Sequence, residues 1–179
     1  MFAPFSKLIS AIKMANYLRL RKRREPQRIA YQKWVAENDV MTAQKRAKLT
    51  QQYAQLGSKP LISVIMPVYN APLGWLDEAI ESVRSQIYQE WELCIADDLS
   101  SNPAIRPYLE HKASQDPRIK VEFRQTNGHI SAASNSAITI ARGDFLTLMD
   151  QDDLIPPYAL LEVAQCINNH PEAGLIYSD

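Results

Sequence analysis

The sequence has few of the residues on which several common protein classes depend. Its 179 residues include only two cysteines, Cys94 and Cys166, spaced neither as metal ligands nor as a disulfide framework. No apolar run approaches the roughly 18 residues that a membrane-spanning helix needs. Pro4, Lys7 and Lys13 interrupt any signal-peptide core. We therefore expect two buried thiols, a reducing compartment and a chain that does not cross a membrane by itself.

Glycine is also scarce, and its scarcity excludes two classes of nucleotide-binding protein. A dinucleotide-binding unit needs a glycine-rich turn after its first strand, whereas residues 67–74 contain a single late glycine. A P-loop needs glycines and a Lys-Ser or Lys-Thr pair at fixed spacing, and the chain has neither. Any phosphate that this chain binds must be held by other means.

The whole chain has no net charge, but its two parts carry large charges of opposite sign. Residues 1–59 carry thirteen Lys or Arg against three Asp or Glu, whereas residues 60–179 carry seven against seventeen. A split of about +10 against −10 indicates a basic arm attached to an acidic globular unit. Since the sequence 57–60, Gly-Ser-Lys-Pro, breaks the helical pattern, we place the domain boundary there.

The arm begins with a pattern typical of a basic amphipathic helix. Apolar residues recur at helical spacing over 5–20, and five Lys or Arg fall between positions 19 and 24. Two interpretations stay open: residues 5–24 contact an anionic membrane surface, or the helix docks on another part of a longer protein or on a partner. Nucleic acid is disfavoured, because the interleaved aromatic residues of a single-strand binder are absent. Further helices are predicted over 27–38 and 42–56.

After residue 60 the periodicity changes to alternating strands and helices. This alternation predicts an α/β domain with a parallel sheet and right-handed crossovers. The expected strands are 61–66, 91–96, 119–123, 145–149 and 173–177, and the expected helices are 76–87, 103–113, 130–141 and 157–168. We expect Pro67 to stop the first strand, since proline cannot donate to a ladder.

Carboxylates follow two of these strands directly. Residues 145–149 form a continuous apolar run, which predicts a central strand covered on both faces, and Asp150, Asp152 and Asp153 come next. The pair at 97–98 follows the strand 91–96. Because ligands of open α/β sheets bind outside the carboxyl ends of the strands, we expect these acids at one site. Clustered carboxylates suit Mg²⁺ or Mn²⁺, so a divalent metal holding a phosphorylated ligand is predicted.

A phosphoaspartate receiver would also carry paired acids at a strand end. It would in addition show a lysine after a later strand, where this chain has 177–179, Tyr-Ser-Asp. An aspartate-nucleophile phosphatase places its acid-spacer-acid pattern early in the domain, whereas here the pattern comes after several strands. Both alternatives are therefore disfavoured.

An ordered set of motifs resembles the nucleotide-binding half of family 2 glycosyltransferases of the GT-A fold, over about residues 60–179. The matching runs are ISVIMPVYN at 62–70, AIESVRSQ at 79–86, WELCIADD at 91–98, NGHISAASN at 127–135, Gly143-Asp144 and DQDD at 150–153. The run YQKW at 31–34 is similar to the segment that precedes this domain in bacterial members that build surface polysaccharides.

The resemblance implies where a nucleotide-sugar donor would bind. By position, Pro67, Val68 and Tyr69 would line the base and ribose pocket, and Asp97 would accept a hydrogen bond from the base imide, with Asp98 structural. The helix that opens at Asn127 would face the pyrophosphate, with side-chain bonds from Ser131 and Asn135, and helix N-termini do favour anions. Asp150 would bind ribose or assist the metal, Asp152 would bind Mg²⁺ or Mn²⁺, and Asp153 could instead cap a helix.

The resemblance also implies an activity and its partners. Family members transfer a sugar from a nucleotide donor with inversion, here to a polysaccharide or lipid-linked acceptor, in the cytoplasm or peripherally at the inner face of the membrane. Their general base lies in the acceptor-binding half, which corresponds to positions after Asp179. We therefore expect either a fragment of a longer glycosyltransferase or a truncated nucleotide-binding or interaction module without transfer activity. His129 is expected to contact phosphate or solvent rather than to act as the base.

Overall fold

The computed structural model describes residues 29–31, 33, 35 and 40–177. The chain divides into two compact units, residues 1–42 and 43–179. The described residues between 29 and 35 are helical, as predicted for the segment 27–38. The basic helix predicted over 5–20, and with it the membrane contact through 5–24, lies outside the described residues. Among the residues described, no helix combines the length and the apolar character needed to cross a membrane.

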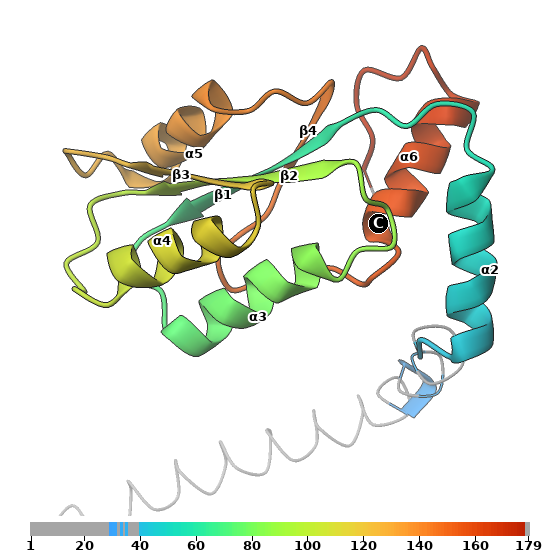
Figure 1. Ribbon diagram of the computed structural model, residues 1–179, viewed down its shortest axis with the longest axis horizontal. Helices are drawn as coiled ribbons and strands as arrows, with labels where there is room; N and C mark the ends of the chain where they lie inside the picture. Colours follow the sequence, from blue (N-terminus) through green and yellow to red (C-terminus); the bar gives the residue numbers. More distant parts are fainter. Residues whose placement is uncertain (1–28, 32, 34, 36–39, 178–179) are drawn as a thin grey trace, which may run out of the picture. The chain divides into compact units, whose positions relative to one another are not determined.

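The second unit contains a four-stranded parallel sheet with helices on both faces, so the predicted α/β architecture is confirmed. The strand order is β3-β2-β1-β4, and every neighbouring pair is parallel. Helices α3 and α4 lie on one face of the sheet and α5 on the other (Figure 1). The elements are α2 Ala43–Ala54, β1 Ile62–Val68, α3 Leu73–Arg84, β2 Trp91–Asp97, α4 Ile105–Gln115, β3 Ile119–Phe123, α5 His129–Thr139, β4 Phe145–Leu148 and α6 Ala159–Asn169.

The order of the strands creates a switch point between β1 and β4. The chain steps outward from β1 through β2 to β3, and α5 then carries it back past β2 and β1 to β4. Right-handed crossovers in opposite directions leave their helices on opposite faces, which explains why α5 lies on the face opposite to α3 and α4 in Figure 1. Loops at such a reversal separate at the carboxyl edge and leave a crevice there.

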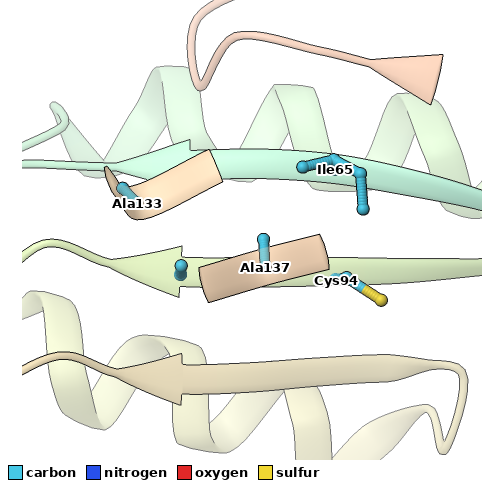
Figure 2. Close-up of a cluster of buried hydrophobic side chains, with 5 residues drawn as sticks. Ile65, Cys94, Ala133 and Ala137 are labelled. Atoms are coloured by element: carbon cyan, nitrogen blue, oxygen red, sulfur yellow. The ribbon is translucent and has the colours of Figure 1, made fainter. Parts of the chain in front are cut away.

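Small residues let α5 pack closely on the two central strands. Ala133 and Ala137 are buried against Ile65 of β1 and Cys94 of β2, and Figure 2 shows them lying over these strands. Because alanine adds only one methyl group, the helix backbone can approach the sheet closely. The packing on the opposite face comes from α3, whose Leu76, Ala79, Ile80 and Val83 are fully buried.

A buried polar cluster connects β1 and β2 with the turn that leads into β4. Ser63 Oγ donates to Glu92 Oε1 at 2.7 Å and accepts from the Gly143 N–H at 2.9 Å. Glu92 also accepts from the Arg142 N–H and from Lys120 Nζ. Burial by itself raises the pKa of Glu92, but Lys120, Ser63 and the Arg142 N–H together hold that pKa below its ordinary value. This cluster therefore contains a buried, ionised glutamate.

The turn before β4 has no room for a side chain at Gly143. A Cβ there would lie 2.5 Å from Ser63 Oγ and 2.7 Å from the Leu61 carbonyl oxygen. We expect Gly143→Ala to lower the free energy of unfolding by about 2 kcal/mol, because the backbone must shift to accept the methyl group. Urea unfolding measures this change.

Gly74 of α3 provides the matched control. A Cβ at Gly74 meets nothing within 4 Å, so Gly74→Ala should be neutral or stabilise the helix by up to ~1 kcal/mol. Equal destabilisation by the two substitutions would contradict the steric argument.

Three expectations about the sheet are wrong. The strand β4 lies at an edge rather than at the centre, with Leu146 50% and Leu148 73% exposed. Residues 173–177 form no strand. Pro67 lies inside β1, paired with Ala96, rather than ending it. The proline is tolerated because its nitrogen faces β4, whose pairing with β1 has already ended at Ile65.

The helix α2 belongs to the same compact unit as the sheet. Ser58 N–H donates to Asn168 Oδ1 of α6 at 2.8 Å, and Lys45 lies 4.5 Å from the centre of the Tyr158 ring. Tyr53 OH donates to Glu90 at the start of β2 at 2.9 Å. The compact unit that contains the sheet begins at residue 43, and the division of the chain into an arm of residues 1–59 and a domain of residues 60–179 stays a prediction. A separate role for the arm stays a prediction.

Candidate donor-binding site

A cavity of about 430 Å³ opens at the carboxyl edge of the sheet, at the switch point between β1 and β4. The end of β1, the end of β2, the start of α5 and the loop after β4 all contribute to its lining. The lining residues are Pro67, Val68, Tyr69, Asp98, Asn127, His129, Ile130, Ala133, Asp150, Gln151 and Asp152. The acids that follow two different strands thus face one cavity, as the topology predicts.

Of the residues predicted to bind a donor or metal, six line this cavity. They are Pro67, Val68, Tyr69, Asn127, Asp150 and Asp152. The structure leaves three others outside the lining. Ser131 and Asn135 are exposed on α5, and Asp97 is buried behind the strand end.

The two aspartates at the end of β2, Asp97 in the strand and Asp98 after it, point to opposite faces of the sheet. Asp97 is 5% exposed and accepts from the Ser100 hydroxyl and the Ser100 N–H, the latter at 3.3 Å. Asp98 follows the alternation of Cys94 and Ala96, which both pack under α5, and it therefore faces α5 and the cavity. Of these two aspartates, it is thus Asp98 that lines the cavity.

Asp98 is held by Arg124 and by the start of α5. Arg124 Nε donates to Asp98 Oδ1 at 2.7 Å, and the Gly128 N–H donates to both carboxylate oxygens at 3.0 and 3.1 Å. Arg124 also donates to the Ala132 carbonyl at 2.9 Å and to Ser136 Oγ. Because Asp98 is only 2% exposed, this pairing compensates a buried charge and fixes the first turns of α5 against the end of β2.

Backbone strain is concentrated at this edge of the sheet. Asn70, Leu99 and His129 have φ angles of 49°, 61° and 63°, and they follow β1, follow β2 and open α5 respectively. Such conformations cost non-glycine residues on the order of 1–2 kcal/mol each, so the surrounding contacts must enforce them. Asn70 shows how: its side-chain oxygen accepts from the Asn102 N–H at 3.0 Å, which joins the first loop to the second.

The donor set of the cavity fits a divalent cation that also binds phosphate. Within the described part of the chain, no three His, Cys, Asp or Glu side chains come together as a metal site. Asp150 and Asp152, both exposed and both lining the cavity, provide a pair of hard carboxylate ligands. Mg²⁺ and Mn²⁺ are commonly held by one or two carboxylates, with phosphate oxygens and water completing the octahedron. Two acids are therefore sufficient where a diphosphate supplies further oxygens.

A family model described as "Glycosyl transferase family 2" matches residues 63–178, which includes the whole cavity and all of the sheet except Ile62. The chain belongs to glycosyl transferase family 2. The resemblance found in the sequence motifs is thereby confirmed.

Two curated relatives of this family 2 chain are much longer than the chain itself. The protein y4gI of Sinorhizobium fredii is 52% identical over 132 residues, covering 74% of this chain and 14% of that protein. The O-antigen biosynthesis protein RfbC of Myxococcus xanthus is 33% identical over 174 residues, covering 95% of this chain and 13% of that protein. The chain thus spans about one seventh of the length of each.

Two solved structures share the fold. TarS of S. aureus, residues 1–349 in complex with UDP-GlcNAc, superposes with a TM-score of 0.56 at 26% identity, covering 66% of this chain and 37% of that chain. The mannosyltransferase PcManGT of Pyrobaculum calidifontis, in complex with GDP-Man and Mn²⁺, has a TM-score of 0.57 at 18% identity, covering 70% and 39%. The family 2 chain therefore has the GT-A fold, as its sequence resemblance implies.

Five lining residues were not among the predicted donor ligands: Asp98, His129, Ile130, Ala133 and Gln151. The alternation of side chains along β2 predicts that Asp98 lies on the same face as Cys94 and Ala96. It indicates the cavity only when the face covered by α5 is known. Gln151 is the spacer between two aspartates, and nothing in the sequence indicates a partner for it. His129 lies in the cavity wall, where the sequence analysis placed it near the site.

Proposed function

We propose that this chain forms the nucleotide-sugar-binding part of a glycosyltransferase that uses Mg²⁺ or Mn²⁺. The observation that carries the proposal is the single cavity in which Asp98 and Asn127 from one side face Asp150 and Asp152 from the other. It is supported by membership of family 2 and by the UDP-GlcNAc and GDP-Man complexes of two proteins with the same fold.

In this proposal, two halves of the cavity bind different parts of the nucleotide-sugar donor. Pro67, Val68 and Tyr69 line the side of β1 and would contact the base and ribose, with the Asp98 carboxylate accepting from the base in place of the predicted Asp97. Asp150 and Asp152 line the side of β4 and would hold the cation together with the diphosphate. Ser131 and Asn135, outside the lining, could reach the donor only through its sugar or through water.

The chemistry of transfer requires charge to be neutralised on the leaving diphosphate. Asp150 and Asp152 would hold a divalent cation, which would supply that neutralisation. The start of α5, at His129, lines the cavity, and the partial positive charge at a helix N-terminus favours a phosphate. We further propose single displacement with inversion, an acceptor of the polysaccharide or lipid-linked type as the name of RfbC suggests, and a general base that lies outside residues 1–179.

Calorimetric titration with UDP, dTDP and GDP, each with Mn²⁺ and each with EDTA, tests the proposed function. We expect at least one of the three nucleotides to bind the chain, and to bind at least tenfold more tightly with Mn²⁺, since Asp150 and Asp152 would hold the cation together with the diphosphate. A chain that binds none of the three, or binds equally well in EDTA, contradicts the proposal.

A further inference from the structure

Gln151 connects the two halves of the cavity. Its side-chain Oε1 accepts from the Tyr69 N–H at 2.8 Å, and its Nε2 donates to the Tyr69 carbonyl oxygen at 3.4 Å. One primary amide thus satisfies both backbone groups of one residue, as a neighbouring strand would in a ladder. The two residues are 82 positions apart in the chain.

This connection lies where the sheet stops joining β1 to β4. Their pairing ends at Ile65 and Leu148, and the Met149 N–H then donates to the Ile65 carbonyl at 3.0 Å. At the switch point beyond it, the strands diverge around the cavity. Gln151 extends the connection between β1 and the loop after β4 into this region. The residues on either side of it, Asp150 and Asp152, are both carboxylates that line the cavity. An uncharged amide can do so without adding to their mutual repulsion.

We propose that Gln151 is a positioning residue that sets the separation between the nucleoside half and the cation half of the donor site. The inference rests on the proposed function, because the affinity of a ligand depends on the separation of the two halves only if the ligand contacts both of them. A nucleoside diphosphate with its cation contacts residues 67–69 and both aspartates at once. Its affinity therefore includes a gain from simultaneous engagement, which depends on the two halves being held at the right distance. A nucleoside contacts only the first half and has no such gain.

The test compares two ligands rather than one. The nucleotide among UDP, dTDP and GDP that the wild-type chain binds most tightly is titrated with Mn²⁺, and its nucleoside is titrated by NMR. For Gln151→Met, which keeps the length of the side chain but removes both hydrogen bonds, we expect the nucleotide with Mn²⁺ to bind about tenfold more weakly. We expect the nucleoside to change by less than about twofold. Gln151→Ala should give the same ratio.

Gln115→Met is the matched control. Gln115 ends α4, is exposed, lies outside the cavity lining and hydrogen-bonds to His111 of the same helix, so this substitution should leave both affinities unchanged. Equal weakening of nucleotide and nucleoside by Gln151→Met would show a general loss of structure and overturn the inference. So would unchanged binding of the nucleotide. A wild-type chain that binds no nucleotide removes the proposed function itself, and this inference falls with it.

Discussion

Asp152→Asn should weaken the Mn²⁺-dependent binding of a nucleoside diphosphate by about 100-fold, or ~2.7 kcal/mol. Asp150 and Asp152 are the carboxylates that the loop after β4 contributes to the cavity, and no third acidic, His or Cys ligand gathers with them in the described part of the chain. Each therefore supplies half of the protein charge that faces the cation. Asparagine keeps the size and one oxygen but loses that charge.

The same substitution should have the opposite sign in EDTA. Without the cation, the Asp152 carboxylate only repels a diphosphate, so Asp152→Asn should bind the nucleotide as well as the wild type or slightly better. Calorimetry in the two buffers measures both effects.

Asp153→Asn is the control for Asp152→Asn. Asp153 is the next residue, is exposed, and lies outside the cavity lining. The substitution Asp153→Asn therefore removes the same charge without removing a proposed metal ligand. We expect a loss of less than about threefold, because exposed charges are screened by salt. If Asp153→Asn weakens binding as much as Asp152→Asn does, the effect is one of general electrostatics and the assignment of Asp152 as a metal ligand is wrong.

Glu92→Ala should lower the free energy of unfolding by about 3–5 kcal/mol at neutral pH. Glu92 is 4% exposed, and its carboxylate accepts from Ser63 at 2.7 Å, from the Arg142 N–H and from Lys120. Removing it leaves the Lys120 ammonium, whose side chain is 26% exposed, without its ion-pair partner. The substitution also leaves a buried hydroxyl and a backbone N–H without their acceptor.

Glu122→Ala provides the comparison for Glu92→Ala. Glu122 lies on β3 and is exposed, so truncating it should cost less than about 0.5 kcal/mol in the same urea experiment. A similar loss for both variants would mean that the cost comes from strand propensity and not from the buried cluster.

The contribution of Glu92 should also depend on pH. Its pKa is lower in the folded chain than the ordinary glutamate value, so the unfolded chain takes up the proton first as the pH falls. The stabilisation is therefore complete above the ordinary pKa and is lost as the pH falls toward and through the folded pKa. The difference in stability between wild type and Glu92→Ala should be constant from about pH 8 to pH 6 and shrink below about pH 4. A difference that grows on acidification would contradict this assignment.

Much of the fold could be predicted because the periodicity of the apolar residues is clear. The strands β1 to β4 and helices α2 to α6 all lie within a few residues of their predicted positions, and β3 matches at both ends. The failures are in tertiary placement. The apolar run 145–149 predicts a central strand, yet Leu146 and Leu148 are exposed, because a run of apolar residues indicates a strand without indicating how many neighbours cover it.

The candidate site divides in a similar way. Acids that directly follow strands could be assigned to one edge of the sheet from topology alone, and Asp150 and Asp152 do line the cavity. The choice between Asp97 and Asp98 could not be made, since neighbouring residues at a strand end point to opposite faces. Only the position of α5, which packs over Cys94 and Ala96, decides that Asp98 faces the cavity.

By itself, the sequence determined the order of the elements, the parallel α/β architecture, family 2 membership and the edge at which polar residues meet, because these follow from local periodicity and from motifs in a fixed order. The tertiary structure alone decided the strand order β3-β2-β1-β4, the face covered by α5 and the contact of Gln151 with Tyr69. These features depend on residues far apart in the chain. Their free energy comes from packing and hydrogen bonds that no local pattern records.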